Sequence, residues 1–516
     1  MRNGTREMIH GVRPSATLTG GWWRRIGIHC LALAATAIVS PAQDEQASTN
    51  SITFAKLDSF DGADGAYPTA SLVQATDGNL YGTAFSGGAN DAGTVFRVSP
   101  TGALKALYSF CSQSACTDGQ NPAAGLIQAM DGNLYGTTEY GGTYGYGTVF
   151  KSSLSGTLTT LYSFCAQSGC ADGSSPVAGL VQATDGNFYG TTQNGGANGS
   201  GTVFQITATG TLTSLHSFNY SVDGIGPLGG LIQATDGNLY GTNWLGGSSS
   251  GGLGTVFQIT LSGALTTLHV FCLESGCPDG QFPESWLVQG TDGDLYGTTT
   301  FGGAHGDGTV FQISLSGTLT TLYSFCSLTG CADGADPFTG LIQATDGNFY
   351  GVTASGGATS TCEPFGRCGT AFQITPTGTL TTLQTFCPKG DCLDGEFPFG
   401  GLLQATNGAI YGTTQFGGSS LSCAYGCGTL FALLTRLGPF VETQPTSGTV
   451  GTQVNILGNN LGATKGVTFN GTAAFFKIVS SSEIQAIVPA GATTGLVTVT
   501  ARDKTLKSNV DFQVLP

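Results

Sequence analysis

Charged side chains are scarce in this sequence. They make up 9% of the 516 residues, whereas 40% of the residues are hydrophobic and 83 are Gly. A low charge content combined with so much apolar material argues against a disordered chain, and no long amphipathic helical pattern is present. The composition therefore predicts a buried, turn-rich, all-β fold. The length predicts several domains or an array of repeats.

Histidine and recognisable catalytic motifs are also scarce. Two of the five His, His216 and His269, replace Tyr in a recurring YSF segment, where we expect them to pack. His305 beside Asp307 is a weak candidate for an acid–base pair. No HExxH motif occurs. The sequence accordingly predicts no catalytic residue, no metal site and no cofactor.

Long apolar runs are missing except near the N-terminus. Arg24 and Arg25 precede an apolar run at residues 26–39, and small residues at 40–42 follow it. This is the pattern of a secretory signal peptide, which we place at residues 1–42. A membrane anchor is the alternative, but the run is shorter than the roughly 20 residues that a membrane span needs. We therefore expect a secreted or cell-surface protein without a transmembrane segment.

Basic residues become rarer still once this segment is removed. Residues 1–42 hold five of the 17 basic residues and one of the 32 acidic residues, which leaves 12 basic and 31 acidic residues and a net charge of −19. An acidic surface of this kind repels phosphate backbones. We therefore expect no nucleic-acid partner.

Cysteine, by contrast, is abundant and regularly placed. One of the 15 Cys, Cys30, lies in the predicted signal peptide, and an even number of 14 remains. Two repeat units lack both cysteines together, as expected if each pair forms one bond. Zinc ligation is the alternative, but no His lies beside the pairs, so we predict local disulfides in an exported protein. The predicted pairs are Cys111–Cys116, Cys165–Cys170, Cys272–Cys277, Cys326–Cys331, Cys362–Cys368, Cys387–Cys392 and Cys423–Cys427.

The segment DGNLYGT at residues 77–83 recurs through the chain. Seven copies or near copies align on a Tyr, and the intervals between these Tyr run from 51 to 61 residues. A period of this length indicates a β-propeller or a solenoid. The aligned tyrosines are Tyr81, Tyr135, Tyr189, Tyr240, Tyr296, Tyr350 and Tyr411.

Each period contains four strand candidates, which in the third unit are residues 179–184, 188–192, 201–207 and 211–218. We interpret DGN as a two-residue hairpin turn with positive φ at both central positions. Calcium ligation by its Asp is the minority alternative. Seven units of four strands predict a seven-bladed β-propeller, with a β-solenoid as the rival fold. Residues 52–60 match a fourth strand and should complete the last blade, which closes the ring.

The alternating direction of the strands sorts the loops onto two faces. The DGN turns and the short turns such as residues 154–156 share one face. The long loops that carry CxxxxCxDGxxP and GGxxGxGT share the other, which we call the loop face.

The C-terminal residues have a different composition and resemble a known module. They contain SG, VGT, GNNL, VTFNG and VPAG in the order of the IPT/TIG family, at residues 447–448, 450–452, 458–461, 467–471 and 488–491. The resemblance implies an immunoglobulin-like β-sandwich at residues 445–516. The repeats, through DGNLYGT, Gly-Gly and GTVFQI, resemble the GloVer-type repeats of exported bacterial proteins over residues 52–434. That resemblance implies no established activity.

The predicted domain order follows from these assignments. A signal peptide (1–42) and a short linker (43–51) precede the propeller (52–436), and a second linker (437–444) leads to the IPT/TIG domain (445–516). The leading functional hypothesis is a non-enzymatic extracellular recognition or scaffold protein that binds a glycan or protein at the loop face. The alternative is a secreted propeller lyase or hydrolase that acts on a polysaccharide or small compound.

Departures from the repeat indicate where a ligand would bind. In the fifth unit PESWLVQG replaces the usual PxxGL(I/V)QA and introduces Glu284 and Trp286, while Trp244 lies in a loop of the fourth unit. Aromatic rings at such positions can stack on sugars; packing between blades is the alternative role. We predict Trp244 and Trp286 as apolar contacts and Glu284 as a polar contact. Aromatic residues also precede Gly-Gly in three units, at Tyr140, Phe301 and Phe416.

Overall fold

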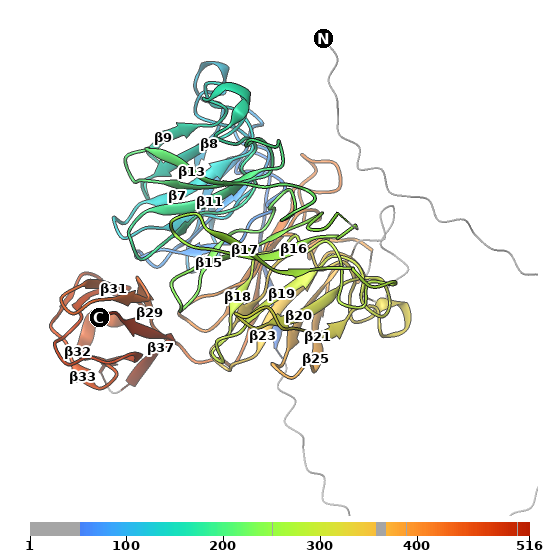
Figure 1. Cartoon of the computed structure of the whole chain (residues 1–516). Coiled ribbons are helices and arrows are strands. Elements are labelled where there is room, and N and C mark those ends of the chain that lie inside the picture. Colours follow the sequence, from blue (N-terminus) through green and yellow to red (C-terminus); the bar gives the residue numbers. More distant parts are fainter. Residues whose placement is uncertain (1–51, 250, 358–367, 389, 503) are drawn as a thin grey trace, which may run out of the picture. The chain divides into compact units, whose positions relative to one another are not determined.

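The computed structural model describes residues 52–249, 251–357, 368–388, 390–502 and 504–516. The predicted signal peptide and first linker lie outside these residues. The described chain forms seven four-stranded antiparallel sheets, here called blades 1 to 7, and two further sheets near the C-terminus (Figure 1). It contains no α-helix in the described ranges. The prediction of an all-β fold with seven blades and a C-terminal sandwich is confirmed.

The blades have nearly identical strand lengths. Blade 1 consists of β2 (Val73–Gln74), β3 (Leu80–Ala84), β4 (Thr94–Val98) and β5 (Leu104–Ser109); blade 2 of β6 (Ile127–Gln128), β7 (Leu134–Thr138), β8 (Thr148–Ser152) and β9 (Leu158–Ser163). Blade 3 consists of β10 (Val181–Gln182), β11 (Phe188–Thr192), β12 (Thr202–Ile206) and β13 (Leu212–Ser217); blade 4 of β14 (Ile232–Gln233), β15 (Leu239–Asn243), β16 (Thr255–Ile259) and β17 (Leu265–Val270).

Blades 5 to 7 repeat the pattern. Blade 5 consists of β18 (Val288–Gln289), β19 (Leu295–Thr299), β20 (Thr309–Ile313) and β21 (Leu319–Ser324); blade 6 of β22 (Ile342–Gln343), β23 (Phe349–Thr353), β24 (Thr370–Ile374) and β25 (Leu380–Thr385). Blade 7 consists of β26 (Leu403–Gln404), β27 (Ile410–Thr414), β28 (Thr429–Leu434) and, from the start of the described chain, β1 (Thr53–Ser59).

The second and third strands of each blade form its interior. All five residues of β11 are buried, as are four of the five in β12. Apolar groups therefore face both sides of the blade, which suits a sheet that packs against a neighbour on each side. The first strand is shorter than predicted: only Val181 and Gln182 pair with β11. It ends there because Ala183 begins the hairpin turn and the Thr184 N–H donates to Gln233 of the next blade.

A cycle of glutamine side chains joins the first strands of neighbouring blades. In each case the Gln carbonyl accepts a backbone N–H from the preceding blade, donated two residues after that blade's own Gln. The Thr76 N–H donates to Gln128 (2.8 Å), and the Thr406 N–H of blade 7 donates back to Gln74 of blade 1 (2.8 Å). The cycle is thereby closed. The other pairs are Met130 with Gln182, Thr184 with Gln233, Thr235 with Gln289, Thr291 with Gln343 and Thr345 with Gln404.

A second cycle consists of phenylalanine pairs. A Phe that follows the fourth strand of one blade packs against the Phe in the third strand of the next, with ring centroids 5.1–5.3 Å apart. Each pair lies in an apolar cluster shared by two blades, and the Phe60–Phe96 pair joins blade 7 to blade 1. The others are Phe110–Phe150, Phe164–Phe204, Phe218–Phe257, Phe271–Phe311, Phe325–Phe372 and Phe386–Phe431.

The predicted completion of blade 7 by the N-terminal strand is confirmed. β1 pairs antiparallel with β28 along its length, from Thr53 opposite Leu434 to Ser59 opposite Thr429. The Phe60 N–H then donates to the Gly428 carbonyl at 3.0 Å. The two ends of the propeller sequence therefore share one sheet, and β28 is not left as an exposed edge.

The DGN turn differs from the prediction of a two-residue turn. The Gly78 N–H donates to the Ala75 carbonyl, and of Asp77 and Gly78 only Gly78 has positive φ. Because the Ala75 N–H also donates to the Asn79 carbonyl, the turn spans three residues, 76–78. The Asp serves as a hydrogen-bond acceptor. Its carboxylate accepts the Asn79 N–H (3.0 Å) and the hydroxyl of the buried Tyr81 (2.8 Å). DGNLYGT is thus a structural unit in which the turn satisfies the hydroxyl of a core tyrosine.

The C-terminal residues fold into a two-sheet sandwich. One sheet has the strand order β29-β31-β35-β34 and the other β30-β37-β36-β32-β33. Val454, Ile456, Phe469, Val497 and Phe512 are buried in the core between them. The strands are β29 (Glu442–Gln444), β30 (Ser447–Gly448), β31 (Gln453–Leu457), β32 (Thr464–Phe469), β33 (Thr472–Ala473), β34 (Phe476–Ile478), β35 (Glu483–Ile487), β36 (Gly495–Ala501) and β37 (Lys504–Val514), with the short 3-10 helix η4 (Leu461–Ala463).

Closure of the ring through β1 predicts a large loss of stability when that strand is removed. Deleting residues 43–60 should lower the melting temperature sharply, because it exposes β28 and removes the fully buried Phe60. Phe60→Ala alone should cost about 3–5 kcal/mol. Thr53→Ala, at an exposed position of the same strand, and deletion of residues 43–51 are the controls. Thermal unfolding measures the effect, and a 43–60 deletion that melts like the full-length chain would contradict the closure.

Candidate functional site on the loop face

The loop face is built from loops that disulfides and buried carboxylates hold together. Six of the seven predicted cysteine pairs are bonded as near neighbours in the structure, Cys111–Cys116 among them; the Cys362–Cys368 prediction involves a residue outside the described ranges. Three of these loops contain a turn of 3-10 helix that ends at the second Cys, namely η1 (Ser114–Cys116), η2 (Ser168–Cys170) and η3 (Thr329–Cys331).

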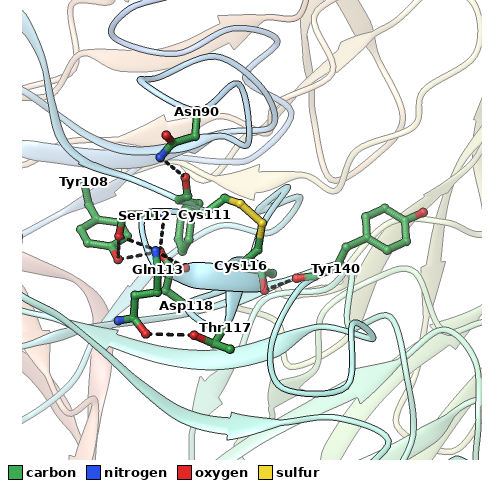
Figure 2. Close-up of a disulfide and its surroundings, with 11 residues drawn as sticks. Asn90, Tyr108, Cys111, Ser112, Gln113, Cys116, Thr117, Asp118 and Tyr140 are labelled. Carbon is green, nitrogen blue, oxygen red and sulfur yellow. Dashed lines mark hydrogen bonds between the residues drawn. A yellow bond between two sulfur atoms is a disulfide. The ribbon is translucent and has the colours of Figure 1, made fainter.

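An aspartate organises each of these loops from within. Asp118 is fully buried and accepts the Ser112 N–H (2.9 Å), the Ser112 hydroxyl (2.9 Å), the Gln113 N–H (3.2 Å) and the Tyr108 hydroxyl (2.7 Å) (Figure 2). Burial raises the pKa of Tyr108 to about 12; the hydrogen bond to Ser112 lowers it and the hydrogen bond to Asp118 raises it. The Asp of CxDG is therefore a structural acceptor.

The loop that joins blade 3 to blade 4, here called the blade 4 loop, shows that the carboxylate can organise a loop without a disulfide. This loop has no cysteine, yet Asp223 accepts the Asn219 N–H and bonds to His216 Nε2, both at 2.6 Å. His216 also packs edge-on against Phe218, with ring centroids 5.1 Å apart. In the loop that joins blade 4 to blade 5, here called the blade 5 loop, Asp279 bonds to His269 of β17 in the same way, at 2.9 Å. Both His thus have structural partners, in addition to the packing that we predicted.

Seven residues surround the start of the first strands and form what we call the inner rim. Each directly precedes the Leu before a first strand. A Cβ built at Gly125 would lie 2.8 Å from the Ser71 Oγ, and one built at Gly179 would lie 3.4 Å from the Gly125 carbonyl oxygen. Neighbouring rim positions therefore touch, and small residues are required at most of them. The rim consists of Ser71, Gly125, Gly179, Gly230, Trp286, Gly340 and Gly401.

Trp286 is the large exception in this rim. A Cβ built at Gly340 would lie 2.5 Å from its indole Nε1, and one built at Gly401 would overlap its six-membered ring. The indole therefore extends from blade 5 over blade 6 to blade 7. It remains partly exposed. Gly340 and Gly401 leave space for the indole. The position of Trp286 therefore depends on two glycines that lie at least 54 positions later in the sequence.

Glu284 lies two residues before Trp286, at a position that Phe338 and Phe399 occupy in the next two blades. Its side chain is only partly exposed, and burial raises its pKa to about 7. Over the part of the chain that the structure describes, burial is the one influence on this pKa, and neither a hydrogen bond nor a charged neighbour offsets it. The site thus contains a carboxyl group that can gain or lose a proton near neutral pH.

Trp244 contacts the same segment from blade 4. Its indole ring lies where a Cβ at Gly226 would be, and its centroid is 5.8 Å from that of Phe282. Phe282 in turn packs edge-on against Phe301 at 6.0 Å. Trp244 therefore joins blades 4 and 5, and Trp286 joins blades 5, 6 and 7. Trp244, Glu284 and Trp286 therefore lie along one sector of the loop face. The two indoles contact different residues: Trp244 packs near Gly226 and Phe282, and Trp286 packs over Gly340 and Gly401.

An aromatic cluster continues from this sector into blades 6, 7 and 1. Phe338 lies 5.3 Å from Phe399, Phe399 lies 5.5 Å from Phe397, Phe397 lies 5.9 Å from Phe416, and Phe416 lies 5.4 Å from Tyr67, all between ring centroids. Of these five residues sequence analysis noted Phe416 alone. The signal for Phe338, Phe397 and Phe399 was the Phe after or before Pro in GADPFTG and GEFPFGG, and Tyr67 precedes Pro in GAYPTAS.

Other candidate ligands on the loop face have structural explanations. Asp307 lies near Cys326 and Cys331, and Glu396 near Cys387 and Cys392, at distances that could hold a metal ion. The four cysteines are in disulfides, however, and a metal would need thiolates. The backbone carbonyl of Asp307 accepts the Asp336 N–H of the next blade at 3.0 Å.

Comparison with protein families identifies the repeats. The model of the Gloeobacter/Verrucomicrobia repeat matches residues 46–252 and, in a second overlapping match, residues 161–365. These matches together cover more than half of the chain. The chain belongs to this repeat family. The IPT/TIG domain model matches residues 440–514 of the same chain, so both resemblances expected for this repeat protein are confirmed. A comparison with curated proteins finds no match.

Solved structures similar to the repeat protein have little sequence in common with it. A fungal alcohol oxidase of the AA5 family in complex with copper is 12% identical, with a TM-score of 0.46 over 88% of this chain and 98% of that chain. The periplasmic gluconolactonase of Pseudomonas aeruginosa is 19% identical, with a TM-score of 0.40 over 61% and 85%. A protein of unknown function from Dyadobacter fermentans is 10% identical, with a TM-score of 0.39 over 74% and 98%.

The carboxylate-centred loops predict that Asp118 matters more than the disulfide beside it. Replacing Cys111 and Cys116 by Ser should cost about 2 kcal/mol, because the closed loop is very short. Asp118→Ala leaves four donors without their acceptor and should cost at least about 3 kcal/mol. Glu274→Ala, an exposed acid in the blade 5 loop, is the control. Thermal unfolding ranks the variants, and a double Cys variant less stable than Asp118→Ala would contradict this ranking.

The raised pKa of Glu284 predicts a pH-dependent gain in stability on neutralisation. A carboxyl group whose folded pKa lies above its unfolded pKa destabilises the fold when ionised. The penalty is absent below about pH 4.5, grows toward pH 7 and is complete above it. Glu284→Gln should therefore raise stability at pH 8, by at most about 3 kcal/mol, and change little at pH 4. Denaturant unfolding at both pH values measures this, and an equal effect at both would contradict it.

Proposed function

We propose that this protein is a non-enzymatic, exported recognition protein that binds an uncharged or cationic ligand at the inner rim of its loop face. The supporting observation is the interruption of the rim by Trp286 together with the Glu284 carboxyl, for which the described residues provide no hydrogen-bond or charged partner. Seven equivalent blades present the same chemistry in seven directions, so they cannot orient one ligand. A departure from the repeat at one sector provides that orientation.

The chemistry of the sector limits the ligand. The partly exposed Trp286 indole provides an apolar, electron-rich face for a sugar ring or an organic cation. Glu284 can accept hydrogen bonds from hydroxyl groups or pair with a cation, and Trp244 extends the aromatic surface toward blade 4. The net charge of −19 after residue 42 repels anions. A neutral glycan or a cationic small molecule therefore fits better than a phosphate or an acidic polymer.

An extracellular location is supported by the disulfides. Six bonded pairs lie on one face of the described chain, and such bonds form and persist in oxidising compartments. Among the described residues no helix has the length and apolar character required to cross a bilayer.

A secreted lyase or hydrolase is the second candidate, and Glu284 is the observation that favours it. A carboxyl group with a pKa of about 7 suits a general acid or base at neutral pH. Such an enzyme needs a second acid, base or nucleophile. The nearest His in the sequence, His216 and His269, are hydrogen-bonded to Asp223 and Asp279 in the loops before the rim segments.

The proposal predicts that Trp286→Ala weakens ligand binding and leaves the ring folded. Glycan arrays and polysaccharide pull-downs supply the ligand, and intrinsic fluorescence measures its binding, because Trp244 and Trp286 are the two Trp after residue 42. We expect about tenfold weaker binding, which corresponds to roughly 1.4 kcal/mol, and a nearly unchanged melting temperature. Leu421→Ala, at a fully exposed position, is the control.

Two further results separate the candidates. If Trp286→Ala collapses the fold while the surviving fraction binds normally, Trp286 is a packing residue and the proposal fails. For a cationic ligand, binding should strengthen as pH rises through 7, and Glu284→Gln should remove that dependence. Turnover of the ligand that Glu284→Gln abolishes would instead establish the enzyme.

A further inference from the structure

One loop of blade 2 displays three tyrosines to solvent. It joins β7 to β8 on the loop face, and Tyr140, Tyr144 and Tyr146 are 38%, 50% and 49% exposed. Large aromatic rings at this level of exposure lose the hydrophobic stabilisation that burial would provide. Three exposed tyrosines within seven residues require an explanation. The residues at the equivalent positions of other blades show whether the repeat accounts for them.

The equivalent of Tyr144 in two other blades is an asparagine that anchors the loop. The side-chain amide of Asn90 donates to the Phe110 carbonyl, and that of Asn198 donates to the Phe218 carbonyl, each at 3.0 Å. Figure 2 shows the Asn90 bond. Blade 2 has exchanged this anchoring amide for an exposed aromatic ring at Tyr144. The repeat alone therefore does not account for the residue.

Tyr146 departs from the repeat in the same way. Its equivalent in blade 1 is the buried Ala92. The backbone contact is kept: the Ser175 N–H donates to the Tyr146 carbonyl at 2.9 Å, as the Asn121 N–H does to Ala92 at 2.7 Å. Between the two rings Gly145 has a φ of +84° and open space where a Cβ would lie. The tyrosine side chains are thus additions to an otherwise unchanged loop backbone.

Backbone hydrogen bonds and a neighbouring disulfide fix the backbone that carries these rings. The Tyr140 N–H and carbonyl pair with Gln120 at 3.1 and 3.0 Å, and the Gly142 N–H donates to the Cys116 carbonyl at 2.9 Å. Cys116 is in turn bonded to Cys111. In Figure 2 the Tyr140 ring extends away from this disulfide. A backbone held in this way loses little conformational entropy when the exposed rings bind a ligand.

We propose that this tyrosine loop, residues 140–147, is a second binding site, and that its ligand is a neutral polysaccharide. Its sequence, YGGTYGYG, contains no charged residue. Pyranose rings have apolar faces bordered by hydroxyl groups, and each Tyr offers an apolar ring with a hydroxyl at its end. Three exposed rings along one loop offer a polymer more than one point of contact. The loop contains no Lys or Arg, and the negative net charge of the chain repels anions, so an anionic polysaccharide is disfavoured.

The test uses the chain from residue 43 to 516 and affinity electrophoresis in gels that contain β-glucan, xylan, galactomannan or starch, with alginate as the anionic probe. The double variant Tyr144→Asn with Tyr146→Ala carries the residues of blade 1, so the repeat itself indicates that it folds. We expect at least one neutral polysaccharide to retard the wild type and the double variant to bind at least tenfold more weakly. Tyr220→Ser, at an exposed tyrosine of the blade 4 loop, should bind like the wild type.

This site does not depend on the inner rim, so Trp286→Ala should leave the retardation unchanged. The proposal is overturned if no neutral polysaccharide retards the wild type, if alginate alone does so, or if the double variant binds as tightly as the wild type. Loss of retardation in Trp286→Ala would assign the polysaccharide to the rim and would also overturn it. Melting temperatures of all variants exclude unfolding as the cause of any loss.

Discussion

The closure of seven blades into a cycle is the constraint on which the rest of the propeller depends. A single blade is apolar on both faces and cannot bury them alone. Each blade therefore needs two neighbours, and blade 7 meets blade 1 through the Gln74 and Phe60 contacts that continue the repeated pattern. The glutamine cycle adds a polar element, because a side-chain carbonyl from one blade satisfies a backbone N–H of another that no strand pairing reaches.

Local hydrogen bonds accommodate many of the acidic side chains in a protein with few cations. Its aspartates act largely as internal acceptors: those of DGN receive a backbone N–H and a tyrosine hydroxyl, and those of CxDG receive the donors of an irregular loop. Burial would raise the pKa of Asp333, but hydrogen bonds from Ser327, Tyr323 and Leu328 lower it. A carboxylate with several donors stays ionised without a salt bridge. Recurrence of these residues therefore reflects folding.

Function in such an array belongs to the positions that the repeat does not explain. Within the inner rim, glycine is required wherever a neighbour approaches closely, and Trp286 is accommodated because Gly340 and Gly401 leave room for it. In the blade 2 loop, tyrosines replace an anchoring amide and a buried methyl group while the backbone contacts persist. Both departures place aromatic surface on the loop face. Neither changes the strands beneath, which is why the scaffold tolerates them.

The sequence by itself determined the period, the number of blades, the local disulfides and the pairing of the N-terminal strand with the last blade. The strands and disulfides follow from short-range patterns, namely apolar runs, turn residues, and two cysteines a few positions apart. The period, the number of blades and the N-terminal strand follow from the recurrence of the unit along the sequence. The tertiary structure decided what links residues of different blades. That Trp286 lies over Gly340 and Gly401, that Glu284 has a raised pKa, and that each Gln bonds to the preceding blade depend on the curvature that brings separate repeats together. No local pattern encodes those distances, because burial and proximity are properties of the closed ring.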